Sequence, residues 1–453
     1  MVKDMTEGKP LKLILSFCVP LVMGNLFQQL YNMADSIIVG QFVGVGALAA
    51  VGATGSLNFL VLGFMNGLCS GFSIPIAQSF GAGRFDEMRS RVCNAMYLGV
   101  GTAILLTILT MIFTPQMLRL MNTPEDIYQD SYRYIIIIFG GIFVIMLYNI
   151  LAGFLRALGD SKTPLYFLII ASVLNILLDL LFILAFNMGV SGAALATVIS
   201  QGVSAVLCLL YIRKKFLILR FSREEIRPSL THSKRLVAIG LPMALQFSIT
   251  AVGSIILQTA VNTLGSGVVA AVTAAGKIQM IVTQPMETLG ITMATYGGQN
   301  IGAGKPARVL KGVRQSLLLE LGYCVAAFFV VAFLGRYIAL LFISPEETLI
   351  LEQMVHFMRI NGLFYPILGI LFIYRNTLQG LGYSVLPMLA GACELVGRSL
   401  VAFCLVGTWG FDAICFANPM AWVAADLMLV TTWIVKSRLL KRDARSQLGQ
   451  EPV

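Results

Sequence analysis

Charge is scarce in this sequence. Only 12% of the 453 residues are Asp, Glu, Lys or Arg, while 57% are hydrophobic. A soluble protein carries about 25% charged residues, and a globule of this size needs them to remain in solution. The composition therefore argues against a soluble enzyme, a disordered scaffold and a disulfide-rich secreted domain. It favours a protein that crosses a membrane several times.

Residues that bind metals or carry out redox chemistry are also few. The two histidines, His232 and His356, stand alone, and the eight cysteines form no CxxC pair. A zinc site or a thiol redox centre would therefore lack ligands. The segment 44–49 loosely resembles a dinucleotide-binding fingerprint, but no strand is predicted before it, and a tight turn between helices explains it. We expect neither enzyme activity nor a cofactor.

Long apolar runs are what the sequence has in abundance. A membrane-spanning helix needs about 20 predominantly apolar residues, and twelve such runs occur. They lie near residues 13–39, 47–78, 92–113, 132–155, 164–186, 190–211, 236–262, 268–298, 315–342, 355–378, 386–406 and 413–435. We therefore expect an all-α integral membrane protein with twelve transmembrane helices.

The loops between these runs alternate in charge. Most of the Lys and Arg residues lie in every second loop and at the two ends, above all in the segment 213–235, whereas the loops between them carry acids such as Glu125, Asp126 and Glu346. Because cytoplasmic loops are enriched in Lys and Arg, both termini are predicted to be cytoplasmic. The net charge of +10 is thus a sign of topology, and we expect no nucleic-acid partner.

The two halves of the sequence resemble each other. QSFGAG at 78–83 recurs as QNIGAG at 299–304, and LRALGDSKTP at 155–164 recurs as LQGLGYSVLP at 378–387. Each half contains six apolar runs, an even number, so both halves start from the same side of the membrane, and such parallel repeats usually enclose a cavity. We expect residues 1–212 and 236–453 to form two six-helix lobes around a central cavity, joined by a cytoplasmic linker at 213–235. The second lobe ends in a short basic cytoplasmic tail.

Two acids interrupt apolar runs of the first half. Asp35 lies in the first run and Asp179 in the fifth, and Asn175 precedes Asp179 by one helical turn. At 1.5 Å per residue, Thr197 in the sixth run lies at a similar depth. A charged side chain at this depth costs about 2.5–3.5 kcal/mol and usually has a function. These four side chains offer hard oxygen ligands to Na⁺, or two nearby carboxylates that accept a proton. Alternatively, each Asp only forms a hydrogen bond with a neighbouring helix.

The second half carries charges of both signs within its runs. Glu287, Arg375, Glu394 and Arg398 lie at similar depths and are predicted to pair, because an unpaired charge there is costly. The network either holds the lobe together or contributes to substrate binding or closure of an inner gate. Lys277 has no partner that the sequence identifies.

Five segments together are similar to the multidrug and toxic compound extrusion (MATE) family. They are QQLYNMADSIIVG at 28–40, LRALGDSKTP at 155–164, NILLD at 175–179, GVSGAALATVISQ at 189–201 and QNIGAGK at 299–305. The resemblance extends over essentially the whole chain. It implies a prokaryotic inner-membrane antiporter that exports amphipathic organic cations against H⁺ or Na⁺ by rocking of two lobes.

The resemblance also assigns roles to residues. Asp35, Asn175, Asp179 and Thr197 match the coupling site that some prokaryotic members carry in the N-terminal lobe, the DinF-like pattern, and a proline at which the first helix bends matches Pro20. Other branches carry essential acids in the seventh and tenth helices. Here the seventh run has no acid and the tenth has Arg375, which argues against a coupling site of that type in the C-terminal lobe.

A drug-binding cavity is harder to define from sequence. Amphipathic or polarizable side chains suit varied cationic ligands, and the candidates are Phe27, Gln28, Tyr31, Met65, Phe139, Met146 and Asn149. An alternative function is a flippase for a lipid-linked saccharide or another amphipathic lipid, which Arg375 and Arg398 favour and the number of runs disfavours. We expect small organic cations and membrane lipids as partners, and a monomer. The sequence identifies neither the coupling ion nor the native substrate.

Overall fold

The computed structural model describes residues 4–121, 123–340 and 343–448, and these residues form helices with no strand among them. Ten helices are long and apolar enough to cross a membrane, and two bent helix pairs raise the number to twelve if each pair is one span. The predicted all-α membrane protein is thus confirmed. The predicted end of the ninth run, at residue 342, lies outside the described residues.

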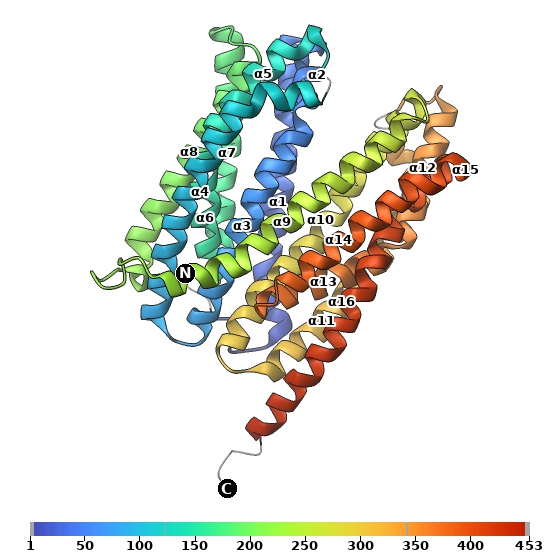
Figure 1. Ribbon diagram of the computed structural model, residues 1–453. Helices are drawn as coiled ribbons and strands as arrows, with labels where there is room; N and C mark the ends of the chain where they lie inside the picture. The colour runs from blue at the N-terminus through green and yellow to red at the C-terminus, as the bar shows by residue number, and fades with distance from the viewer. Residues whose placement is uncertain (1–3, 122, 341–342, 449–453) are drawn as a thin grey trace. The chain divides into compact units, whose positions relative to one another are not determined.

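The helices follow one another with short connections (Figure 1). Those of the first half are α1 (Pro10–Ile38), η1 (Val39–Val43), α2 (Val45–Ala53), α3 (Gly55–Gly81), α4 (Phe85–Leu120), α5 (Glu125–Gly140), α6 (Ile142–Ala157), α7 (Lys162–Leu180), η2 (Leu181–Ala185), α8 (Val190–Lys215) and η3 (Leu217–Leu219). Those of the second half are α9 (Leu230–Asn262), α10 (Ser266–Gly302), α11 (Pro306–Ala339), α12 (Thr348–Leu363), α13 (Tyr365–Gly380), α14 (Val385–Leu400), η4 (Val401–Leu405), α15 (Val406–Trp409) and α16 (Phe411–Leu448).

Two predicted runs are bent in the structure. The fourth run is divided into α5 and α6, which meet at 47°, and the tenth is divided into α12 and α13, which meet at 50°. At the first bend, a Cβ atom on Gly141 would lie 2.4 Å from Val198 of α8, so only glycine permits this approach. At the second bend, Pro366 in the first turn of α13 has no N–H to donate to the preceding helix.

The chain divides into two compact units that do not coincide with the halves of the sequence. The main part of the first unit is Val19–Ala244, and the second unit combines Met5–Cys18 with the described residues of Leu245–Val453. We call Met5–Cys18 the N-terminal arm and residues 216–244 the central arm. Each arm includes the first turns of a long helix, α1 or α9, and packs in the unit that contains most of the other half. The chain changes unit close to Pro20 in α1 and close to Pro242 in α9.

The N-terminal arm is held by the QNIGAG segment and the start of α11. Gln299 Oε1 accepts a hydrogen bond from the backbone N–H of Met5 at 2.9 Å. Lys305 Nζ donates to the carbonyl oxygen of Thr6 at 3.1 Å, and Arg308 Nη2 donates to that of Met5 at 3.2 Å. Met5 and Thr6 are buried. The arm is therefore an integral part of the second unit.

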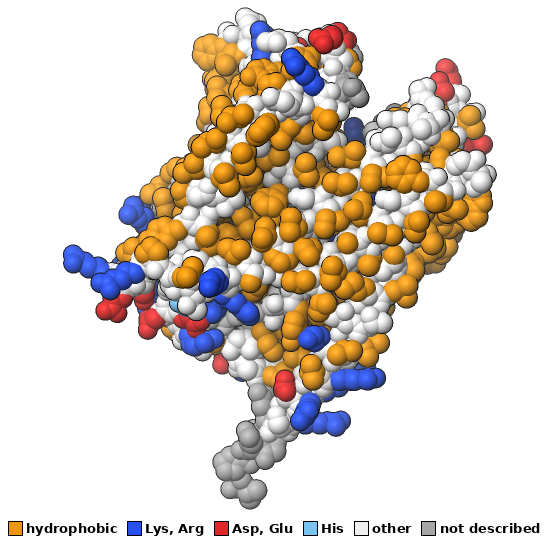
Figure 2. Space-filling view, in the orientation of Figure 1, with side chains coloured by type: hydrophobic (Ala, Val, Ile, Leu, Met, Phe, Trp, Pro, Cys, Tyr) orange, Lys and Arg blue, Asp and Glu red, His pale blue; other side chains and the backbone are white. Residues whose placement is uncertain are grey.

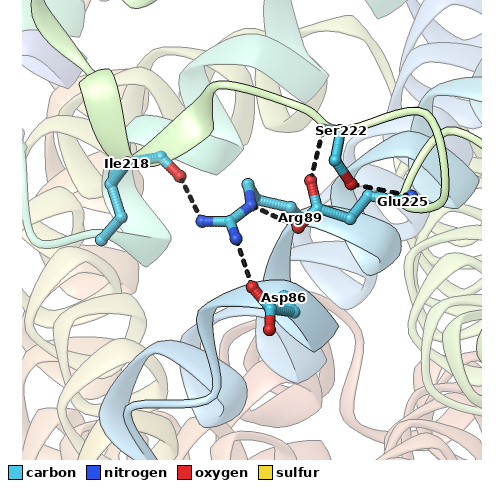
Figure 3. Close-up of polar contacts among 5 residues, drawn as sticks. All are labelled: Asp86, Arg89, Ile218, Ser222 and Glu225. Atoms are coloured by element: carbon cyan, nitrogen blue, oxygen red, sulfur yellow. Dashed lines mark hydrogen bonds and ion pairs between the residues drawn. The ribbon is translucent and has the colours of Figure 1, made fainter.

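The central arm is held in a similar way by the start of α4 (Figure 3). Arg89 Nε donates to Glu225 Oε1 at 2.7 Å, its Nη1 donates to the carbonyl oxygen of Ile218 at 3.2 Å, and it also pairs with Asp86. Ser222 donates its backbone N–H to the second oxygen of Glu225 at 2.7 Å. The predicted linker is thus docked onto α4 along much of its length.

Electrostatics and further hydrogen bonds stabilise this docking. Burial disfavours the charged form of Glu225, but the hydrogen bonds from Ser222 and Arg89 outweigh burial, so the pKa of Glu225 lies below its ordinary value. Asn94 Oδ1 accepts hydrogen bonds from the Ser229 N–H at 2.9 Å and from the Ser233 hydroxyl at 3.0 Å. The central arm therefore remains attached at neutral pH.

Hydrophobic side chains fill the core and also cover the outside of the helices. Phe72, Phe139 and Phe154 are fully buried in the core of the first unit. Figure 2 shows hydrophobic side chains along the exposed length of α9, whereas Lys and Arg gather where the α8–α9 segment and the end of α16 lie. A surface with this pattern suits hydrocarbon between two polar layers.

Candidate functional site

Two acids predicted to bind the coupling cation lie together in the first unit. Asp35 of α1 and Asp179 of α7 are buried, with 7% and 0% of their surface exposed, and their carboxyl groups interact directly. Asn175, also buried, lies one turn before Asp179 on α7. The structure thus brings together acids that are far apart in the sequence.

These polar groups have unused hydrogen-bonding capacity. Among the described residues, no partner is present for either carboxylate oxygen of Asp179, for Oδ1 of Asp35, or for either side-chain atom of Asn175. Buried polar groups are normally satisfied. Two ionised carboxylates only accept hydrogen bonds, so neither satisfies the other until one carries a proton or a cation lies between them.

Thr197 lies in a narrow pocket beside these residues. The polar side chains that line this pocket come from α1, α7 and α8, and they are Tyr31, Ser172, Asn175, Thr197, Ser200 and Gln201. The Thr197 hydroxyl donates to the carbonyl oxygen of Ala193 at 3.1 Å, which leaves its lone pairs available to a cation. The structure therefore places the fourth predicted ligand next to Asn175.

Three further polar side chains border the acids. Tyr31, predicted for the substrate cavity, lies close to both acids and is hydrogen bonded to Gln201. Tyr134 of α5 is also near both acids. Gln201 and Tyr134 were not predicted from the sequence as site residues. Gln201 follows Thr197 by one turn of α8, the same spacing as that from Asn175 to Asp179, and this spacing is the signal that could have identified it.

The helices that carry the acids change their hydrogen bonding just after them. The π-helical segment η1 begins four residues after Asp35, and η2 begins two residues after Asp179. Such segments are rare and often occur at functional sites. Pro20 lies within α1, which is helical from Pro10 to Ile38, and its missing N–H leaves one intrahelical hydrogen bond unmade.

Some predicted cavity residues lie in the core of the first unit. Met65, Phe139 and Met146 are buried there and pack against their neighbours, and Met146 also borders a small pocket among apolar side chains. Phe27 and Asn149 are half-buried and Gln28 is exposed. These residues were selected for their amphipathic or polarizable side chains, and residue type alone does not distinguish a packed side chain from one that faces water.

The predicted charged network of the second half is present. Arg375 pairs with one carboxylate oxygen of Glu394, and Arg398 Nη2 lies 3.5 Å from the other. Glu287 is half-buried and interacts with Arg375, as does Asp426 of α16. Two acids in the predicted runs were missed: Asp426 and Glu320, the latter 2% exposed and with Oε1 unpartnered among the described residues. An acid inside an apolar run, the pattern that singled out Asp35, would have identified both.

Comparison with known protein families identifies the family to which this chain belongs. A family model described as MatE matches residues 20–181 and 242–403, which include most of the chain and repeat as the sequence predicted. The chain belongs to the MatE family. This confirms the resemblance found in the sequence. MatE proteins are membrane transporters and not enzymes, so the expected multi-pass transporter is confirmed.

Several relatives are similar over most of their length. The chain is 31% identical over 380 residues to probable multidrug resistance protein YpnP of Bacillus subtilis (strain 168), with 84% of each chain covered. It is 30% identical over 400 residues to probable multidrug resistance protein YoeA of the same strain, with 86% of this chain and 85% of the relative covered. A solved MOP superfamily transporter from Pyrococcus furiosus Vc1 has a TM-score of 0.90 at 23% identity, covering 96% of this chain and 98% of that one. That structure was described as having a binding pocket of reverse polarity.

The MatE segments begin where the arms end. The first matched segment starts at Pro20 and the second at Pro242, and the chain changes unit within three residues of each proline. The N-terminal arm and nearly all of the central arm therefore lie outside the MatE segments. Each arm thus precedes a matched segment and packs in the unit that contains most of the other half.

Proposed function

We propose that this MatE protein is a cation-coupled antiporter that exports amphipathic organic cations across the plasma membrane, with both termini in the cytoplasm. The coupling cation is H⁺ or Na⁺. The observation that carries this proposal is the buried Asp35–Asp179 pair, for which the described residues supply no Lys or Arg as an ion-pair partner. Such a pair is stable only when a cation from solution neutralises part of its charge.

The ligands at the site suit either cation. Asp35 and Asp179 supply carboxylate oxygens, and Asn175 and Thr197 add neutral oxygens. Hard oxygen ligands of this kind suit Na⁺, and two carboxyl groups in contact also share a proton readily. When bound, the cation would neutralise the pair, and the chain's own contribution is to hold the four side chains in place.

Transport follows if the loaded and empty sites favour different conformations. A ligand shifts a conformational equilibrium only by its difference in affinity for the two states. In the proposed cycle, cation binding from outside favours drug release, and cation release inside favours drug binding. Bending of α1 at Pro20 would connect the site to this change, because α1 carries both Pro20 and Asp35. Cation and drug then need not share ligands.

The similar proteins support export as the direction of transport. Relatives at 30% and 31% identity are named probable multidrug resistance proteins, and a more distant one, 21% identical, is named a multidrug export protein. We extend this to the present chain with organic cations as substrates. The second candidate, a lipid-linked saccharide flippase, is supported only by the buried Arg375 and Arg398.

Proteoliposomes containing the purified full-length chain test the proposal. A pH gradient and a Na⁺ gradient are imposed separately, and movement of ethidium is followed by fluorescence. We expect transport under one of the two gradients and none in Asp35→Asn. Ethidium movement that depends on neither gradient, or an unchanged rate in Asp35→Asn, would contradict the coupling assignment.

A further inference from the structure

Lys277 is a charged residue inside a spanning helix for which the transport mechanism has no role. It lies eleven residues after Ser266, the first residue of α10, which places it about 16 Å along the helix axis. Its side chain is exposed. An ammonium group facing lipid at this depth is costly, and the lysine side chain is too short to bring the charge back to the end of the helix. This face of α10 therefore meets water.

The same face borders a pocket of the size that small ligands need. A pocket of about 570 Å³ lies within the second unit, and its polar lining consists of Asn262, Ser266, Thr273 and Lys277. Small-molecule sites usually measure about 300–1,000 Å³. Ser266, Thr273 and Lys277 follow helical spacing on one side of α10, so the lysine is one member of a continuous polar face.

The neighbouring helix extends this polar face. Gln258 of α9 donates a hydrogen bond from Nε2 to Asn262 Oδ1 at 2.9 Å. Ser254 lies one turn before Gln258, and both side chains are exposed. Elsewhere on α9 the exposed side chains include Val252 and Ile255, which suit lipid. Serine, glutamine and asparagine at one-turn intervals are what a water-facing side requires.

The residues that line this pocket include no acid, and among the described residues no acid pairs with Lys277. Residues 236–262 of α9 contain no acid, and the next acid on α10 is Glu287, ten residues beyond Lys277, or about 15 Å along the axis. The pocket therefore carries one uncompensated positive charge together with hydroxyl and amide donors. An anionic group is the ligand that such donors recognise.

We propose that Lys277, assisted by Asn262 and Thr273, binds an anionic group, such as a carboxylate, of the exported compound. The substrates then include amphipathic zwitterions that combine a cationic ring system with a carboxylate. This inference rests on the proposed export function and narrows it to a substrate class.

A pair of rhodamine dyes isolates the anionic group. One dye has its carboxyl group esterified and is a simple cation, and the other is the same dye with a free carboxylate. Binding to the purified full-length protein in detergent is measured by fluorescence anisotropy. For Lys277→Gln we expect the Kd of the free-acid dye to rise about tenfold, which equals about 1.4 kcal/mol, and the Kd of the ester to stay unchanged. Lys277→Arg should retain most of the affinity.

Controls separate this inference from the proposed function. Lys441→Gln removes the same charge from an exposed position on α16 and should change neither Kd. Equal effects of Lys277→Gln on both dyes, or no effect on either, would overturn the proposal. If phosphatidylglycerol displaces the free-acid dye from the wild type but not from Lys277→Gln, and proteoliposomes do not transport that dye, the anionic group belongs to a lipid. If wild-type protein binds both dyes but transports neither, the export function fails while the anion site stands.

Discussion

At the scale of single residues, Asp35 and Asp179 occupy unequal positions. Asp179 is fully buried, and neither of its carboxylate oxygens has a hydrogen-bond partner among the described residues. Asp35 is 7% exposed, and only its Oδ1 is both buried and without a partner among the described residues. In the proposed mechanism we therefore expect Asp179 to depend more strongly on the bound cation, and Asp35 to be the acid closer to water.

Replacing either acid should abolish transport. Asp35→Asn and Asp179→Asn each remove one of the two charges proposed to retain the cation, so drug resistance should be lost while the protein is still made and inserted. Thr197→Ala should only weaken transport, because the hydroxyl is one ligand among several. Resistance to ethidium in cells, with expression checked by immunoblot, provides the measurement. Asp126→Asn, at an exposed position, should behave as wild type, and full resistance in either of the first two variants would contradict the site.

Glu394 is the centre of the charged network in the second half. It pairs with both Arg375 and Arg398, so Glu394→Gln leaves two buried guanidinium groups without their carboxylate. Loss of one partner of a buried pair costs about 3–5 kcal/mol, and we expect a large fall in thermal stability in detergent. Adding Arg398→Gln should restore part of the loss. Strictly additive losses would indicate that these residues do not stabilise each other and would revive a substrate-binding role.

At the scale of helices, α1 connects the N-terminal arm, the proline and the first acid. Pro20 lacks the N–H that would complete the helical ladder, and α1 is otherwise continuous to Ile38. Pro20→Ala should restore this hydrogen bond and stiffen the helix. Turnover of ethidium should then fall several-fold while its Kd changes little. Wild-type turnover would remove this bend from the mechanism and favour direct competition between cation and drug.

The docking of the central arm onto α4 is another property of an element. Arg89→Gln removes one charge-assisted hydrogen bond to Glu225 and one to the carbonyl oxygen of Ile218, each worth about 1.5–3 kcal/mol. Trypsin should therefore cut the arm at Arg220 and Arg223 faster in this variant. Arg84→Gln is the matched control, since the Arg84 side chain is 61% exposed and its ion pair, with Glu87, does not involve the central arm.

The same attachment has a defined pH dependence. Because the pKa of Glu225 is held below its ordinary value, its contribution to stability is complete above the ordinary carboxyl pKa of about 4.3. It is lost as the pH falls through the lowered value. Glu225→Gln mimics the protonated form and should give the rapid cleavage of Arg89→Gln at neutral pH. Slow cleavage in both variants would show that Asn94 and the other contacts suffice.

The sequence predicted the helices better than it predicted their bends and neighbours. Hydropathy depends on residues that follow one another, so all twelve runs correspond to helices or bent helix pairs. The bend at Gly141 depends on Val198 of another helix, and no local pattern contains that contact. For the same reason, Asp35 and Asp179 were identifiable as buried acids, but the positions of Gln201 and Tyr134 near them depend on the packing of two further helices, α8 and α5. Hydropathy also predicted the membrane spans but not the two arms, because the arms are defined by contacts with residues of the other half.

At the scale of the whole molecule, the two compact units each require both halves of the sequence. The second unit buries Met5 and Thr6 of the N-terminal arm, and the core of the first unit includes Leu236 and Ala244 of the central arm. A chain divided after Lys215 would yield one fragment without the central arm and another without the N-terminal arm. Each fragment made alone should be degraded, and both made together should restore transport, measured as ethidium resistance. Stable accumulation of either fragment alone would contradict this dependence.

The exchanged arms also define what kind of object the polypeptide is. In a domain-swapped dimer, each copy packs one of its segments into the other copy. The N-terminal arm and the central arm have the same connectivity here. In this protein the two copies are present once each and are joined end to end by residues 216–229, which now form part of one of the swapped segments. A covalent junction of this kind fixes the ratio of the two copies at one to one. It also allows the two copies to differ in charge: the first carries a buried pair of acids, and the second carries a buried network of acids and arginines.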